Sequence, residues 1–184
     1  MAGKPWVDAN YRFIAAYQEV NARIAQRQQA LALYVTLVVS ILAALVALKP
    51  GAGAGHVPVE WLLLGFPVAS TCLAFLNYKA ERAITNLRQF LTTLERLERD
   101  VHGLPSYNTD PRWSARANQA RRFHDLAAAV LVAGGNGIGL AAASSIYPER
   151  IADNRAILWL AIAASLASLA ALLLSPRWSF RPEE

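Results

Sequence analysis

The sequence predicts an all-α membrane protein with four transmembrane helices, two long cytoplasmic amphipathic helical extensions, and both termini in the cytoplasm. Composition is the first reason: 55% of the 184 residues are hydrophobic and only 17% are charged, whereas soluble domains are about a quarter charged. The second reason is how the apolar residues are distributed. Four blocks contain no Asp, Glu, Lys, Arg or His, namely residues 31–48, 61–76, 126–146 and 157–174.

Each block approaches the length of a bilayer span. A hydrocarbon core about 30 Å thick takes roughly 20 helical residues. The block at 61–76 is the shortest, but residues 57–59 extend it, and Trp61 and Tyr78 stand where interfacial aromatic side chains are expected. The first and last blocks are apolar on every side, unlike a helix on the surface of a soluble protein. We therefore expect two transmembrane hairpins, at 31–76 and 125–175.

Lysine and arginine residues assign the remaining segments to two sides of the membrane. Of the 18 such residues, 15 lie on the side of both termini and 3 on the other. Because cationic loops stay in the cytoplasm, both termini are expected there. The cytoplasmic segments are then an amphipathic helix at 1–30, a heptad helix with a basic link at 77–124, and a tail at 176–184. The loops on the far side are too short to fold alone, which removes an external receptor or enzyme domain.

Apolar residues in both long cytoplasmic segments recur at alternating steps of three and four, which is typical of a coiled-coil seam. The first series is Phe13, Tyr17, Val20, Ile24, Arg27 and Leu31, in which Arg27 is the one charged residue. The second is Ala83, Leu87, Phe90, Leu94, Leu97 and Val101. A seam needs a partner, so the two helices face either each other or a neighbouring subunit. The candidate oligomer-seam residues are Phe13, Tyr17, Val20, Ile24, Leu87 and Leu94.

A basic region precedes the third span. Residues 106–116 contain turn formers and are predicted to be an irregular link, followed by a short helix at 115–124. The candidate ligand-binding residues are Arg112, Trp113, Arg116, Arg121 and Arg122. Arginines beside an aromatic ring can bind a phosphate-bearing ligand or single-stranded nucleic acid by ion pairing and stacking. A polybasic stretch next to an interfacial tryptophan explains the same residues.

One amide lies halfway along the third block. Asn136 is surrounded by glycines, and an amide at the membrane midplane is costly unless it bonds to another helix or faces water. It therefore either fixes helix packing or lines a pore in a symmetric oligomer. The candidate pore-lining residues are Asn136, Gly135, Gly139 and Ser144.

Other sites are disfavoured by the sequence. The spans contain no titratable Asp, Glu, Lys, Arg or His, which argues against an ion-coupled transporter. His56, His102 and His124 are dispersed and lack metal-ligand spacing, and the one cysteine, Cys72, lies within a span. No nucleophile has an evident base, so we expect neither enzyme activity nor a cofactor or metal.

The segment from residue 11 to 102 resembles small bacterial membrane effectors of anti-phage defence, the SLATT class and the four-span effector of the Hailong system. The resembling features are a helix with spaced arginines (Arg12, Arg23 and Arg27), a tight transmembrane hairpin, and a long charged helix returning to the cytoplasm. SLATT members look like two-span proteins, whereas this chain adds a second hairpin. The resemblance implies a pore-forming oligomer in the bacterial inner (plasma) membrane, gated by a nucleotide or DNA oligomer that a companion nucleotidyltransferase makes.

Three functions follow as hypotheses. The leading one is a homo-oligomeric ion channel in the lipid bilayer, with four subunits favoured and the third span lining the pore. The alternative is a non-conducting membrane scaffold that recruits a cytoplasmic partner through its helical extensions. A small-molecule or lipid transporter has only the four-span count in its favour.

Overall fold

The computed structural model describes residues 8–49, 58–102, 107–108 and 110–178. The parts of the predicted segments that fall on residues 1–7, 50–57, 103–106, 109 and 179–184 lie outside this description. The described residues contain helices and no strand. The elements are α1 (Ala9–Ala47), α2 (Val59–His102), α3 (Pro111–Ile146), α4 (Pro148–Asp153), α5 (Arg155–Leu174) and the 3₁₀ turn η1 (Ser175–Trp178).

Helices α1, α2, α3 and α5 are long and apolar enough to cross a membrane, which confirms the prediction of an all-α chain with four such helices. Helix α5 has 20 residues and is about 30 Å long, which matches the hydrocarbon core. Helix α1 has 39 residues and helix α2 has 44, so at about 58 and 66 Å each is much longer than one span requires. The cytoplasmic location of the parts of α1 and α2 that extend beyond the spans stays a prediction.

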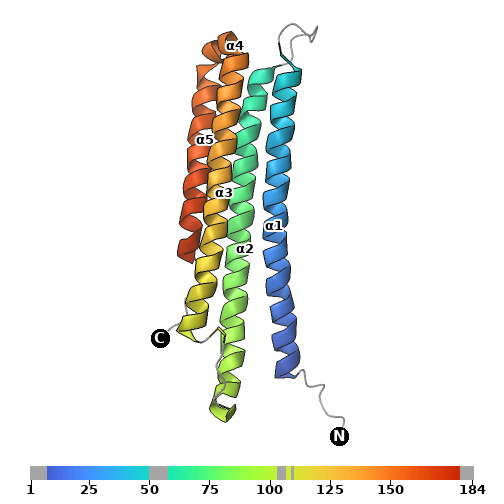
Figure 1. Cartoon of the computed structure of the whole chain (residues 1–184), viewed down its shortest axis with the longest axis vertical. Helices are drawn as coiled ribbons and strands as arrows, with labels where there is room; N and C mark the ends of the chain where they lie inside the picture. The colour runs from blue at the N-terminus through green and yellow to red at the C-terminus, as the bar shows by residue number, and fades with distance from the viewer. Residues whose placement is uncertain (1–7, 50–57, 103–106, 109, 179–184) are drawn as a thin grey trace.

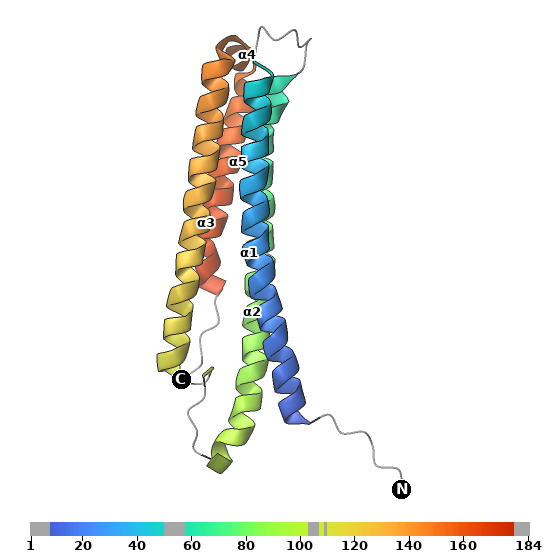
Figure 2. The ribbon, with the colours of Figure 1, turned by 45° about the vertical axis from the view of Figure 1, so that its right-hand side comes forward.

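The four long helices stand side by side as a bundle (Figures 1 and 2). Helix α1 packs against α2, α2 against α5, α5 against α3, and α3 against α1, and α2 also contacts α3 across the bundle. Helix α1 begins and α5 ends toward the same end of the bundle, which we call the N-terminal end; the short helix α4 lies at the other end (Figure 1).

Helix α3 starts earlier than the sequence predicts, so the expected irregular link at 106–116 is wrong from residue 111 onward, whereas the helix expected at 115–124 is confirmed as part of α3. Asp110 is the N-cap residue, and its carboxylate accepts a hydrogen bond from the Arg112 backbone N–H at 2.9 Å. Pro111 occupies the first helical position, where its missing N–H costs nothing. The Asp-Pro pair therefore begins a helix that continues without interruption to Ile146.

The main apolar core fills the space between the spans. Phe66, Leu63, Leu45 and Leu172 are fully buried in it. Many other apolar side chains of the spans point outward, including Phe75 and Val130, which are 69% and 63% exposed. Such an outer surface is expected against lipid tails and would be unusual in water.

Candidate functional site

Charged residues stand at the ends of three apolar blocks, and the structure brings them together inside the bundle. Arg27 lies just before the block in α1, Glu81 just after the block in α2, and Asp125 directly before the block in α3. Helices α1 and α3 lead away from the N-terminal end and α2 returns to it, so the three block ends meet at one level. All three side chains are buried, and with Asn77 they form what we call the Arg27 cluster.

The Arg27 guanidinium connects the members of the cluster. Its Nε donates to Asn77 Oδ1 at 3.0 Å, its Nη1 to Glu81 Oε2 at 3.4 Å, and its Nη2 to Asp125 Oδ1. A guanidinium has five N–H donors in a rigid fork, so one side chain can bond to two helices at once. Arg27 therefore ties α1 to both α2 and α3.

Burial makes this cluster costly to break. The side chains of Arg27, Glu81 and Asp125 are 5%, 1% and 4% exposed. Deleting one partner of a buried ion pair costs about 3–5 kcal/mol, because the other charge loses its compensation away from water. Loss of Arg27 would deprive two carboxylates of the same guanidinium.

Two polar atoms, one in this cluster and one beside it, lack a hydrogen-bond partner among the described residues. They are Nδ2 of Asn77 and Nε2 of His124, the residue before Asp125, and both are buried. The polar groups here are therefore not fully satisfied by the chain's own side chains. Across the described part of the chain, no group of three or more His, Cys, Asp or Glu could hold a metal ion.

A second polar layer crosses the middle of the spans around Asn136. Its Nδ2 donates to Ser70 Oγ and to the Val132 carbonyl, both at 2.7 Å, and Ser165 Oγ donates to its Oδ1 at 2.8 Å. The amide is buried and joins α3 to α2 and α5. A hydroxyl pair 2.9 Å apart, Thr71 and Ser168, adds a contact between α2 and α5.

The four predicted pore-lining residues do not share one face of α3. Asn136 and Gly139 are buried, Gly135 is half-buried, and Ser144 is exposed. Of the two roles that the sequence leaves open for Asn136, an interhelical hydrogen bond is the one present within a single chain. Lining a pore in an assembly stays a prediction for these residues.

The glycines of α3 divide into an inner and an outer set. A Cβ on Gly139 would meet the Phe66 ring at 2.6 Å, and one on Gly135 would meet the Tyr34 hydroxyl at 2.8 Å. These two glycines let α3 approach α2 and α1 closely. A Cβ on Gly134 or Gly137 would meet nothing within 4 Å, so these two face open space.

The predicted ligand-binding residues lie on the first turns of α3. Arg112, Trp113, Arg116 and Arg122 are exposed, while the side chain of Arg121 lies outside the described residues. The Arg116 guanidinium sits 5.5 Å from the centre of the Trp113 ring, within the range of a cation–π contact. The structure thus brings an arginine and an aromatic ring together on one helical turn.

The predicted seam lies between the two long helices of the chain itself. Its buried cluster consists of Ala16, Val20, Ile84 and Leu91, with Phe13 and Leu87 packed against it. Leu94 is half-buried. Tyr17 and Ile24 are exposed instead, at 53% and 38%. Of the two partners that the pattern allows, α1 and α2 therefore serve as partners for each other, and contact with a neighbouring subunit through Tyr17 and Ile24 stays a prediction.

At the far end of the bundle, Tyr147 connects α1 to the junction of α3 and α4. Its hydroxyl donates to the Leu45 carbonyl at 2.8 Å. Burial raises the pKa of the Tyr147 phenol above its usual value, and the nearby Arg150 offsets part of this effect. The hydroxyl therefore stays protonated and able to donate.

Sequence reasoning did not single out the Arg27 cluster as a site. One signal was present, because Arg27 occupies a core position of the heptad pattern, where an apolar residue is expected. The first polar residues beyond the apolar blocks, Asn77 and Asp125, are the matching signal on the other helices. No family model matches the chain, and neither the curated proteins nor the solved structures provide a match.

Proposed function

We propose that this chain is the subunit of a homo-oligomeric membrane channel, in which neighbouring subunits meet along one face of α3. The observation that carries the proposal is an exposed row on α3 at steps of seven residues. The row consists of Arg116, Phe123, Val130, Gly137 and Ser144. Positions seven apart lie within about 20° of each other on an α-helix, so this row is one continuous, unpartnered face.

Within the span, this face is made largely of small residues. Ala133, Gly134, Gly137, Ala141 and Ser145 are all exposed there, and we call them the small face of α3. In lipid, helices associate by close packing and not by burial of apolar surface, so small residues mark contact surfaces. We assign a second copy of the chain as the partner that packs closely against this face.

A pore in such an assembly lies between subunits. The interior of one chain is filled by large side chains, Phe66, Leu63 and Leu45 among them, which are fully buried. An aqueous path through a single bundle would have to displace them, whereas a path enclosed by the outer faces of several bundles would not. The number of subunits, for which we expect four, sets the width of that path.

Gating would act through α3, because that helix carries both the basic residues and the small face. It has 36 residues without a break, about 54 Å, and Arg112 and Arg116 project on the same side as Gly137. A phosphate-bearing ligand held by these arginines and Trp113 would lie at the junction between subunits. In the anti-phage defence effectors that the sequence resembles, the implied ligand is a nucleotide or DNA oligomer made by a companion nucleotidyltransferase.

Ion flux from liposomes containing the purified protein tests the proposal. The informative variant is Gly137→Leu. A Cβ added at Gly137 meets no atom of the chain within 4 Å, so the variant should fold, but the leucine side chain would push away a helix of a neighbouring subunit. The matched control is Ala163→Leu, which adds a leucine at an exposed position of α5. Cross-linking in the same liposomes reports the oligomer.

We expect the wild-type protein and the Ala163→Leu variant to conduct and to cross-link alike. For Gly137→Leu we expect both the flux and the cross-linked product to fall at least tenfold, a change of about 1.4 kcal/mol in association. A fully cross-linked Gly137→Leu protein would exclude the small face as the contact. Absence of flux from the wild type across a panel of mono-, di- and oligonucleotides would exclude the channel.

A scaffold is a second candidate function, favoured by the exposed seam residues Tyr17 and Ile24 on α1. These side chains could receive a helix of a cytoplasmic partner without disturbing the buried seam. The double variant Tyr17→Glu/Ile24→Glu separates the two functions. A scaffold would lose its cellular effect while the liposome measurements stay unchanged, whereas a channel would keep its effect.

A further inference from the structure

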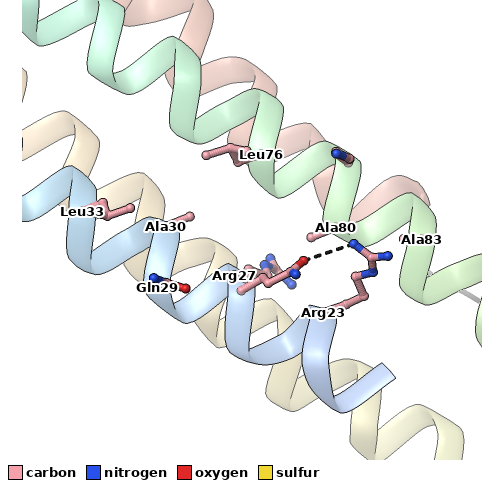
Figure 3. A pocket seen from close by; sticks show the side chains of 10 residues that line it. Arg23, Arg27, Gln29, Ala30, Leu33, Leu76, Ala80 and Ala83 are labelled. Carbon is pink, nitrogen blue, oxygen red and sulfur yellow. Dashed lines mark hydrogen bonds between the residues drawn. The ribbon is translucent and has the colours of Figure 1, made fainter. Parts of the chain in front are cut away.

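A pocket of about 310 Å³ opens between α1 and α2 at the level where their apolar blocks end (Figure 3). Only residues of these two helices line it. Leu33 and Leu76 lie at one end of the pocket, and Arg23 and Ala83 at the other. The pocket is hollow because alanines, Ala30 and Ala80 among them, face each other where larger side chains would fill the space.

The two ends of the pocket differ in chemistry. Leu33 and Leu76 are 56% and 50% exposed and belong to the apolar blocks, so they face the lipid tails. Arg23 and Lys79 lie beyond the ends of these blocks and line the polar part. Arg27 also lines the pocket, but its guanidinium is held by Asn77 and the two carboxylates of the Arg27 cluster.

Hydrogen bonds hold the Arg23 guanidinium at the polar end. Its Nη1 donates to Gln26 Oε1 at 3.2 Å, and its Nη2 pairs with the exposed Glu19 at 2.6 Å. An exposed ion pair of this kind is weak, at about 0.2–1 kcal/mol. An anion of higher charge density, such as a phosphate, can therefore displace the Glu19 carboxylate and bind Arg23.

We infer that this pocket binds an anionic phospholipid of the adjacent leaflet, with its phosphate between Arg23 and Lys79 and its acyl chain along Leu33 and Leu76. A cationic end joined to an apolar end matches an amphipathic ligand with an anionic head. Basic residues at the membrane surface attract anionic lipids in this way. The amide of Gln29 lines the same pocket and can bond to hydroxyl groups of the headgroup.

The volume supports a headgroup and not a whole lipid inside the pocket. Pockets that enclose small molecules measure about 300–1,000 Å³, so 310 Å³ is at the low end. A phosphate and its glycerol fit within such a space, and the acyl chains continue outside it in the bilayer. This inference requires the membrane placement of α1 and α2 but not channel activity, so it stands or falls separately from the proposed function.

Native mass spectrometry of the full-length protein in detergent, titrated with lipid, tests the inference. The probes are phosphatidylglycerol and phosphatidylcholine with identical acyl chains, and inorganic phosphate as a competitor. The variant is Arg23→Gln/Lys79→Gln. Its control, Arg12→Gln/Arg96→Gln, removes the same number of charges at exposed positions of the same two helices outside the pocket.

We expect phosphatidylglycerol to bind about tenfold more tightly than phosphatidylcholine, and the pocket variant to lose about tenfold in that affinity. The control should stay within about twofold of the wild type. Glu19→Gln removes the competing carboxylate and should tighten binding about two- to fivefold. Circular dichroism of each variant verifies that the helical fold is retained.

Three results would overturn the inference. Equal phosphatidylglycerol affinity of the pocket variant and its control would show that the lipid binds elsewhere. Displacement of phosphatidylglycerol by an equal concentration of inorganic phosphate would make free phosphate, and not a lipid, the ligand. A smaller oligomer in the pocket variant with unchanged lipid affinity would assign the pocket to a second copy of the chain.

Discussion

Arg27 and Asp125 are 98 residues apart in the sequence and form a buried ion pair that joins α1 to α3. The same guanidinium also bonds to Glu81 of α2, so three helices are held together where their apolar blocks end. Along α3, Asp125 lies between the basic first turns and the small face. Any movement of α3 relative to α1 must therefore either break this ion pair or move Arg27 together with Asp125.

The Arg27→Met variant should be strongly destabilised. It leaves Glu81 and Asp125 buried without their shared guanidinium, and we expect a loss of about 3–5 kcal/mol in the free energy of unfolding. Denaturation in mixed micelles, followed by circular dichroism, measures it. Arg12→Met, at an exposed position of the same helix, is the control and should change stability by less than about 0.5 kcal/mol. If Arg27→Met were as stable as the control, the ion pairs would have no structural role.

Two glycine substitutions on α3 should have opposite effects. Gly139→Ala forces a methyl group against the fully buried Phe66 ring, and overpacking of this kind costs about 1–3 kcal/mol. Gly137→Ala meets open space and gains up to about 1 kcal/mol of helix propensity. Thermal unfolding of both variants in the same detergent is the measurement. Equal melting temperatures would contradict the packing of α3 against α2.

Asn136→Ala should weaken the bundle moderately. The variant removes the hydrogen bonds to Ser70 and Ser165, and such bonds contribute about 0.6 kcal/mol on average within membranes and up to about 1.7. Ser144→Ala, on the exposed side of the same helix, is the control and should be neutral. Micelle denaturation distinguishes the two. A loss no larger than that of the control would mean that the amide has other partners in the folded protein.

Tyr147→Phe should lower stability by about 1 kcal/mol at neutral pH, because it removes the hydrogen bond to the Leu45 carbonyl. The pKa of this phenol is raised in the folded chain, so its contribution is fully present below the unfolded pKa of about 10 and is lost as the pH rises through the folded value. The difference between wild type and variant should therefore shrink above pH 10. Tyr107→Phe, at an exposed position, is the control. A difference that does not depend on pH would exclude the phenol as its source.

The four spans were predictable because the signal is local: a charge-free block of sufficient length requires no knowledge of its neighbours. The start of α3 was not predictable, because the pair Asp110-Pro111 is equally typical of a turn and of a capped helix. The partners of Asn136 were not predictable, since Ser70 and Ser165 reach it only through the order of the helices in the bundle. The heptad pattern predicts Arg27 as a seam position on the cytoplasmic side, but its burial depends on an ion pair with Asp125, which only the packing of α3 against α1 brings close.

The uninterrupted course of α3 has a geometric consequence for Asn136. Successive residues on an α-helix differ by about 100°, so a rotation of α3 by one such step about its own axis would move Asn136 to the position that Gly137 holds now. The amide would then leave Ser70 and Ser165 and stand on the outer face, among residues that line the junction between subunits in the proposed assembly. The same rotation would pull Asp125 away from Arg27. The ion pair at the end of the spans therefore opposes this rotation and favours the arrangement in which the amide bonds to Ser70 and Ser165.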